Sequence, residues 1–196
     1  MALTLTSQNF KEGATLGMEH ILSADYGFGC GGGNKSPQLS WSGAPAGTKS
    51  FAVHCFDPDA PTGSGFWHWV VVNIPPDVTE LKLDAGNPKS GLLPKGALMT
   101  RTDFGPPGYG GPAPPPGHGP HRYQFTVFAV KEASLPVNAD TSAAVVGFYL
   151  LRDWRSIIGM ANAWLPHRYA GVIRAQAHEV DRILSAWVRG QALCCL

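Results

Sequence analysis

Three segments of the chain carry the hydrophobic pattern of β-strands. Residues 50–57 (SFAVHCFD) alternate around aromatic and β-branched side chains. Residues 66–74 (FWHWVVVNI) are too apolar for a strand with one wet face, which places them at the centre of a sheet. Residues 121–130 (HRYQFTVFAV) form the third segment, and Gly, Pro, Asp or Asn bounds all three. Several strands without intervening helices predict a mainly β fold, an antiparallel β-sandwich.

Helical patterns occur towards the C-terminus. Residues 141–154 are predicted to form a helix, with Thr141 or Ser142 as the candidate N-cap. Residues 172–188 repeat apolar side chains at a spacing that suits one face of a second helix.

The two ends of the chain also differ in composition. All seven lysines precede residue 132, whereas six of the eight arginines follow residue 150. We therefore predict one β-rich domain with a few short helices over residues 1–163, and a C-terminal extension, helical or partly disordered, over residues 164–196.

Composition narrows the functional classes. A length of 196 residues fits one domain, and a net charge of +1 provides no general attraction to nucleic acid. No stretch approaches the roughly 20 apolar residues of a membrane helix, and the N-terminus lacks the pattern of a signal peptide. The four cysteines show no zinc-site spacing, so a reducing, cytoplasmic location is expected.

Residues 105–120 (GPPGYGGPAPPPGHGP) stand out because thirteen of the sixteen are Gly or Pro. Such a segment cannot form a helix or an inner strand. Long loops inside compact domains are usually functional or disordered. The prolines would stiffen this loop, which favours a preformed wall beside a site.

The candidate chemistry begins at Asp57, which ends the first strand before a Pro- and Gly-rich turn. His68 follows near the start of the next strand, where strict alternation places it on one face with Val70 and Val72, opposite Trp67. A lone histidine in this setting is more often a satisfied core residue than a ligand. A buried imidazole without a partner costs about 1–3 kcal/mol, and Asp57 is the nearest candidate partner in the sequence.

His121 and Tyr123 share a strand face directly after the Pro/Gly loop, so rigid strand ends carry both histidines. Together with Asp57 and His68 they would offer hydrogen-bond donors, one acceptor and an aromatic floor. A phosphate group suits two imidazole donors. Asp57 would repel a phosphate placed against it. The aspartate would instead fix the tautomer or charge of His68, or receive a substrate ammonium, and the sequence leaves both roles open.

Other functions are also compatible with these residues. Asp57, His68 and His121 could form a three-ligand metal site or a general acid–base set, which would make the protein an enzyme. The segment 29–36 resembles a phosphate-binding loop, but Asn34 stands where that motif requires Gly, and Pro37 follows at once, which favours a solvated turn.

Three motifs resemble the hallmarks of the phosphatidylethanolamine-binding protein family, in its bacterial Raf kinase inhibitor-like branch. Asp-Pro-Asp-Ala-Pro spans 57–61, His-Trp-Val-Val-Val-Asn-Ile spans 68–74, and Gly-Pro-His-Arg-Tyr spans 119–123. The order is that of the family, and the resemblance runs from about residue 3 to residue 150. The expected closing strand with Gly-x-Tyr has only a partial match, at 156–161, which lacks the Tyr.

The resemblance implies an antiparallel β-sandwich with a small surface pocket for phosphate-type anions or the phosphoethanolamine head group of a lipid. It implies a binding or regulatory protein rather than an enzyme, without a cofactor or metal. It also implies a homodimer and, as a further role, inhibition of a kinase or protease. The positions that match the family pocket are Asp57, His68, Pro114, Pro115, His121 and Tyr123.

Overall fold

The computed structural model describes residues 2–151. The predicted helix over 172–188 and the extension over 164–196 lie outside the described residues, as does the end of the helix predicted over 141–154. In chain order the described elements are β1 (Thr4–Thr6), the 3₁₀ helix η1 (Ala24–Tyr26), β2 (Leu39–Ser42), β3 (Ser50–Asp57), β4 (Phe66–Ile74), β5 (Glu80–Leu81), β6 (Leu98–Met99), β7 (Gln124–Val130) and α1 (Ala143–Leu151).

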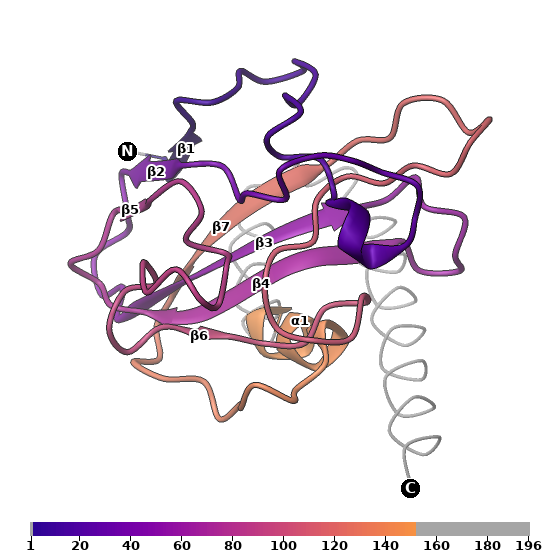
Figure 1. The fold of residues 1–196 in the computed structure, drawn as a ribbon. Coiled ribbons are helices and arrows are strands. Elements are labelled where there is room, and N and C mark those ends of the chain that lie inside the picture. Colours follow the sequence, from indigo (N-terminus) through magenta and orange to yellow (C-terminus); the bar gives the residue numbers. More distant parts are fainter. Residues whose placement is uncertain (1, 152–196) are drawn as a thin grey trace, which may run out of the picture. The chain divides into compact units, whose positions relative to one another are not determined.

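The strands form two antiparallel sheets, as the hydrophobic pattern predicts. One sheet has the order β1-β2-β5 and the other the order β6-β4-β3-β7 (Figure 1). Strands β3 and β4 have the predicted bounds and occupy the two central positions of the four-stranded sheet. Strand β4 is apolar on both faces because Trp69 and Val71 pack in the core between the sheets, whereas Val70 and Val72 pack in the cluster that contains Ala143 and Val146 of α1.

A core of large side chains joins the two sheets. Trp41 of β2 meets Phe51 of β3 edge to face, with ring centroids 5.4 Å apart. Leu39 of β2 and Leu81 of β5 are fully buried in the same cluster as Trp69 and Val71 of β4. These contacts make the pair of sheets a sandwich, because side chains from both inner faces interlock in one core.

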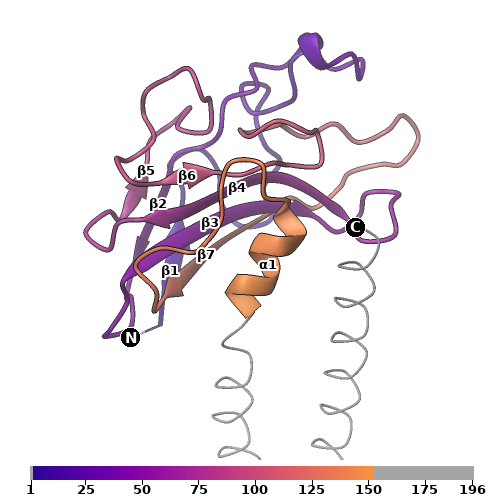
Figure 2. The same cartoon turned by 90° about the horizontal axis from the view of Figure 1, so that it is seen from below.

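The outer face of the four-stranded sheet is covered by α1 (Figure 2). Ala143 and Val146 are buried there in a second cluster, whereas Val145 is exposed. The carbonyl of Ser142 accepts the backbone N–H of Val146, so Ser142 occupies the N-cap position, one of the two predicted.

Strand β4 contains a β-bulge at His68, which corrects the predicted side-chain faces. Between two consecutive residue pairs of the ladder, β3 advances by one residue, from Cys55 to Phe56, whereas β4 moves by two residues, from Trp69 to Trp67. The additional residue is His68. Trp67 consequently packs on the outer face with Val70, on the side that strict alternation assigns to His68. Bulges re-aim a side chain in this way beside functional sites.

Strand β7 begins at Gln124, three residues later than predicted. The backbone N–H of Arg122 donates to the carboxylate of Asp59 at 2.8 Å. This contact to a side chain takes the place of a ladder bond, so residues 121–123 lie outside the regular sheet, next to the turn that follows β3.

Candidate functional site

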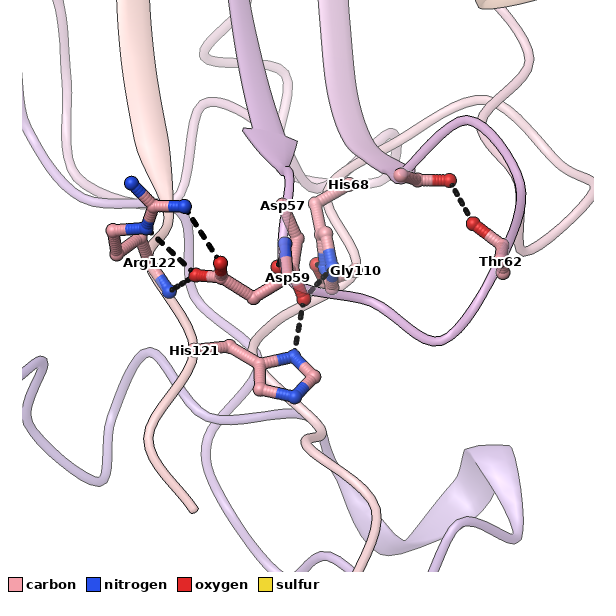
Figure 3. A network of polar contacts seen from close by, with 8 residues as sticks. Asp57, Asp59, Thr62, His68, Gly110, His121 and Arg122 are labelled. Atoms are coloured by element: carbon pink, nitrogen blue, oxygen red, sulfur yellow. Dashed lines mark hydrogen bonds and ion pairs between the residues drawn. The ribbon is translucent and has the colours of Figure 1, made fainter. Parts of the chain in front are cut away.

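Asp57 lies at the centre of the site (Figure 3). It is the last residue of β3 and only 2% of its surface is exposed. Its Oδ1 accepts the backbone N–H of Asp59 at 2.8 Å, and its Oδ2 accepts the Nδ1–H of His121 at 2.7 Å. An ionised carboxylate can only accept, so the bond fixes Nδ1 of His121 as the protonated nitrogen.

His68 faces the same carboxylate but is held by a different partner. Its Nδ1–H donates to the carbonyl oxygen of Gly110 at 2.7 Å, whereas its Nε2 lies 3.9 Å from Asp57 Oδ2 (Figure 3). The expectation that Asp57 is the hydrogen-bond partner of His68 is therefore wrong, since Asp57 fixes the tautomer of His121 and Gly110 fixes that of His68. Burial lowers the pKa of His68, against the smaller raising effects of the Gly110 bond and the Asp57 charge.

Aromatic rings surround the His68 imidazole. The ring centroids of Phe66, Phe104 and Tyr123 lie 5.1, 5.3 and 5.1 Å from that of His68. Tyr123 stands nearly perpendicular to the imidazole, and burial raises the pKa of its hydroxyl well above the ordinary value. The aromatic side of the site is thus formed by Phe66 of β4, by Tyr123 just before β7 and by the segment that carries Phe104.

Asn34 positions the backbone that holds His68. Its Oδ1 accepts the N–H of Gly111 at 2.8 Å, and its Nδ2 donates to the carbonyl of Tyr109 at 3.2 Å. The intervening Gly110 bonds His68 twice, since its N–H also donates to the His68 carbonyl at 2.9 Å. A Cβ on Gly110 would lie 2.3 Å from the Phe104 ring, so glycine is required at this close approach.

Sequence reasoning missed Asn34 and Gly110 as functional positions. In the sequence, Asn34 stands where a phosphate-loop motif would require Gly. A signal was present, because Asn is one of the few residues that tolerate a positive φ, and Asn34 has φ 50°. The contact to residues 109–111, some 75 positions away, is a product of the tertiary fold.

A second carboxylate locks the turn after β3 to the start of β7. Asp59 receives Arg122 in a bidentate pair, with Nε to Oδ2 at 2.9 Å and Nη2 to Oδ1 at 2.7 Å. The side-chain and backbone hydrogen bonds from Arg122 lower the pKa of Asp59 to about 2. Because Asp59 and Arg122 are close neighbours of Asp57 and His121 in the sequence, the pair holds both halves of the site in register (Figure 3).

The structure brings together three of the six predicted positions by direct polar contacts, namely Asp57, His68 and His121. Tyr123 lies beside His68 and packs, together with Phe125, against the core between the sheets. Pro114 is exposed and Pro115 half-buried, on the loop that leads to His121. That these two prolines line a ligand pocket stays a prediction.

The geometry gives no support to a three-ligand metal site. Across residues 2–151, no group of three or more His, Cys, Asp or Glu side chains is arranged to hold a metal ion.

Comparisons with known proteins identify relatives of the chain. The sequence profile of the phosphatidylethanolamine-binding protein family matches residues 6–153. The chain is 54% identical to the UPF0098 protein YbcL of Escherichia coli over 149 residues, 76% of this chain and 80% of YbcL. It is 50% identical to the UPF0098 protein YbhB of the same organism over 148 residues, 74% of this chain and 89% of YbhB.

Solved structures show the same relationship. The crystal structure of E. coli YbcL, described as a new member of the mammalian PEBP family, superposes with a TM-score of 0.73 at 53% identity, over 76% of this chain and 90% of YbcL. The PEBP homologue CT736 of Chlamydia trachomatis gives a TM-score of 0.59 at 27% identity, over 74% of this chain and 86% of CT736. The protein belongs to the phosphatidylethanolamine-binding protein family.

Membership of the family brings the mainly β, antiparallel fold that the strand pattern predicts.

The helices between residues 2 and 151 are too short to cross a lipid bilayer.

Proposed function

We propose that this protein is a binding protein whose site at Asp57, His68 and His121 takes a small anion of the phosphate or phosphoethanolamine type. One observation carries the proposal: two imidazoles converge on a buried carboxylate, and each has its Nδ1 occupied by a fixed acceptor. The Nε2 atoms are the nitrogens left to meet a ligand. Imidazole nitrogens suit phosphate oxygens once they carry protons.

Both oxygens of Asp57 already accept hydrogen bonds, from Asp59 N and from His121 Nδ1. This arrangement favours an orienting role for Asp57 over direct contact with an anion. An ammonium group of phosphoethanolamine could still approach Oδ2 from the side of His68, where the nearest nitrogen is 3.9 Å away. A comparison of inorganic phosphate with phosphoethanolamine therefore separates binding of the anion by the imidazoles from binding of an ammonium group by Asp57.

The test is a titration with each of these two compounds, followed by the histidine side-chain resonances in NMR between about pH 6 and pH 8, where imidazoles change charge. Saturable shifts of His68 and His121 are expected, with binding lost in His68→Ala and His121→Ala. His118→Ala is the matched control, because it removes an exposed imidazole from the neighbouring loop. Unchanged affinity in both site variants, measured by calorimetry, would exclude this site.

A binding role is proposed over an enzymatic one because the chain belongs to a family named for ligand binding. Metal analysis of the purified protein tests this choice. Stoichiometric zinc or iron would favour the enzyme alternative.

The finer roles implied by the family resemblance are proposed on that basis alone. We expect a homodimer, a cytoplasmic location and, as a further role, inhibition of a kinase or protease. Light scattering of the purified protein and fractionation of cells test the first two. Pulldown with the intact chain, followed by an inhibition assay on any kinase or protease captured, tests the third.

A further inference from the structure

The hydrogen bonds of the site determine which of its atoms can donate to a ligand. The carbonyl of Gly110 and the carboxylate of Asp57 can only accept, so the Nδ1 protons of His68 and His121 are both committed. With each imidazole neutral, the remaining Nε2 atoms carry lone pairs. The inward-facing polar atoms of the two histidines and Asp57 are then all acceptors, and an anion would meet no N–H donor from them.

The charges around the site oppose an anion as well. Asp57 is a buried carboxylate, and Asp103 lies near enough to His68 for its charge to act on the imidazole. Asp59 and Arg122 neutralise each other in their bidentate pair. With neutral imidazoles the site is therefore negative, and Tyr123, whose ring lies against that of His68, adds no positive charge.

We propose that this site binds its anion only together with a proton. The proton lies between an imidazole and the anion, either on Nε2 of His68 or His121 or on an oxygen of the ligand. The proposal rests on the proposed function and defines its ligand more closely, as an anion that binds more tightly as the pH falls. A proton at that place converts an acceptor into a donor and offsets the charge of Asp57. Burial, which lowers the pKa of His68, keeps that imidazole neutral in the empty site.

Inorganic phosphate and sulfate are matched probes, because both are tetrahedral but sulfate stays fully deprotonated at neutral pH. Calorimetry at about pH 8, above the ordinary imidazole pKa of about 6.5, in two buffers of different ionisation enthalpy gives the number of protons taken up. We expect about one proton for each anion bound, and an apparent Kd that rises about tenfold per pH unit above pH 7. Sulfate that binds with uptake places the proton on the protein, and phosphate that binds while sulfate does not places it on the ligand.

Three variants identify the proton carrier. His68→Gln and His121→Gln each replace an imidazole with a side chain that cannot take up a proton, and loss of the sulfate-linked uptake in either variant supports the proposal. His118→Gln is the control, since His118 lies 5.8 Å from His121 by ring centroid but on the exposed loop. It is expected to retain the uptake, and loss of uptake in this variant alone would overturn the proposal.

Two outcomes separate this inference from the proposed function. Saturable binding with no proton uptake and the same Kd between pH 7 and pH 9 would overturn the inference and leave the anion site intact. No binding of phosphate, phosphoethanolamine or sulfate at any pH would overturn the proposed function and the inference with it. Thermal melting of each variant without ligand confirms that any loss does not come from unfolding.

Discussion

His121 donates from Nδ1 to Asp57 Oδ2 at 2.7 Å, while His68 Nε2 lies 3.9 Å from the same oxygen. The two histidines are therefore unequal partners of one carboxylate. His121 is bound to the aspartate, whereas His68 is bound to the backbone of Gly110 and feels Asp57 through its charge.

Asp57→Asn is expected to lower the pKa of His68 further, because it removes a negative charge that favours the imidazolium. An asparagine would also place its NH₂ group against one of the two N–H donors that now bond Asp57, from Asp59 or His121. The loss of that hydrogen bond costs about 1–3 kcal/mol of unfolding free energy. An NMR pH titration of His68 and chemical denaturation measure the two effects. Asp103→Asn is the control with a smaller expected shift, and an equal shift in both variants would contradict the assigned role of Asp57.

Asn34→Ala is expected to destabilise the protein by about 1–3 kcal/mol, because the buried N–H of Gly111 and carbonyl of Tyr109 lose their partner. The bond from His68 Nδ1 to Gly110 should loosen, which NMR detects as faster exchange of the Nδ1 proton. Asn87→Ala, in an exposed turn, is the matched control with little expected effect on either quantity. A His68 Nδ1 proton as well protected as in the wild type would show that Asn34 does not position this segment.

Arg122→Ala is expected to raise the pKa of Asp59 from about 2 towards its ordinary value of 3.8, since Arg122 provides the hydrogen bonds that lower it. A depressed carboxyl pKa stabilises the fold above about pH 4, and the effect is lost as the pH falls towards 2. Carboxyl carbon resonances of Asp59 measure the shift. Arg101→Ala, which removes a guanidinium bonded to the Gly105 carbonyl instead, should leave Asp59 unchanged.

His54 is expected to make the fold sensitive to mild acid. It is 8% exposed, packs between Trp67 and Phe128 on the outer face, and burial lowers its pKa from 6.5 to about 4. The neutral imidazole stabilises the fold fully above pH 6.5, and about 3 kcal/mol of that stability is lost as the pH falls from 6.5 to 4, because the unfolded chain binds the proton more readily.

The variant His54→Leu tests this assignment by denaturant unfolding at a series of pH values. The slope of stability against pH between 4 and 6.5 should flatten in the variant, whereas the exposed His118→Leu should keep the wild-type slope. An unchanged slope in His54→Leu would mean that other groups cause the acid sensitivity.

The strands were predictable because local pattern and tertiary burial agree in them. The bounds of β3 and β4 follow directly from runs of β-branched and aromatic residues between turn residues. The start of β7 was not predictable, because the backbone N–H of Arg122 donates to Asp59. That partner is 63 residues away in the sequence, and no local pattern reveals it.

The proximity of three candidate residues was predictable, but the hydrogen bonds that connect them were not. The motifs identify Asp57, His68 and His121, and they do meet. The bulge at His68 breaks the period of two on which face assignment rests, and the pattern of the sequence does not show which histidine bonds the aspartate. The roles of Asn34 and Gly110 depend on backbone contacts, which leave little trace in a single sequence.

The Pro/Gly loop divides into an anchored part and a part open to solvent. Its residues 105–107 bond to Arg101 and Thr102, and its residues 109–112 bond to Gly86, His68, Asn34 and Leu22. Residues 116–120 are exposed. Substitutions or insertions within residues 116–120 are therefore expected to reshape the approach to the site, while the bond that holds His68 stays in place.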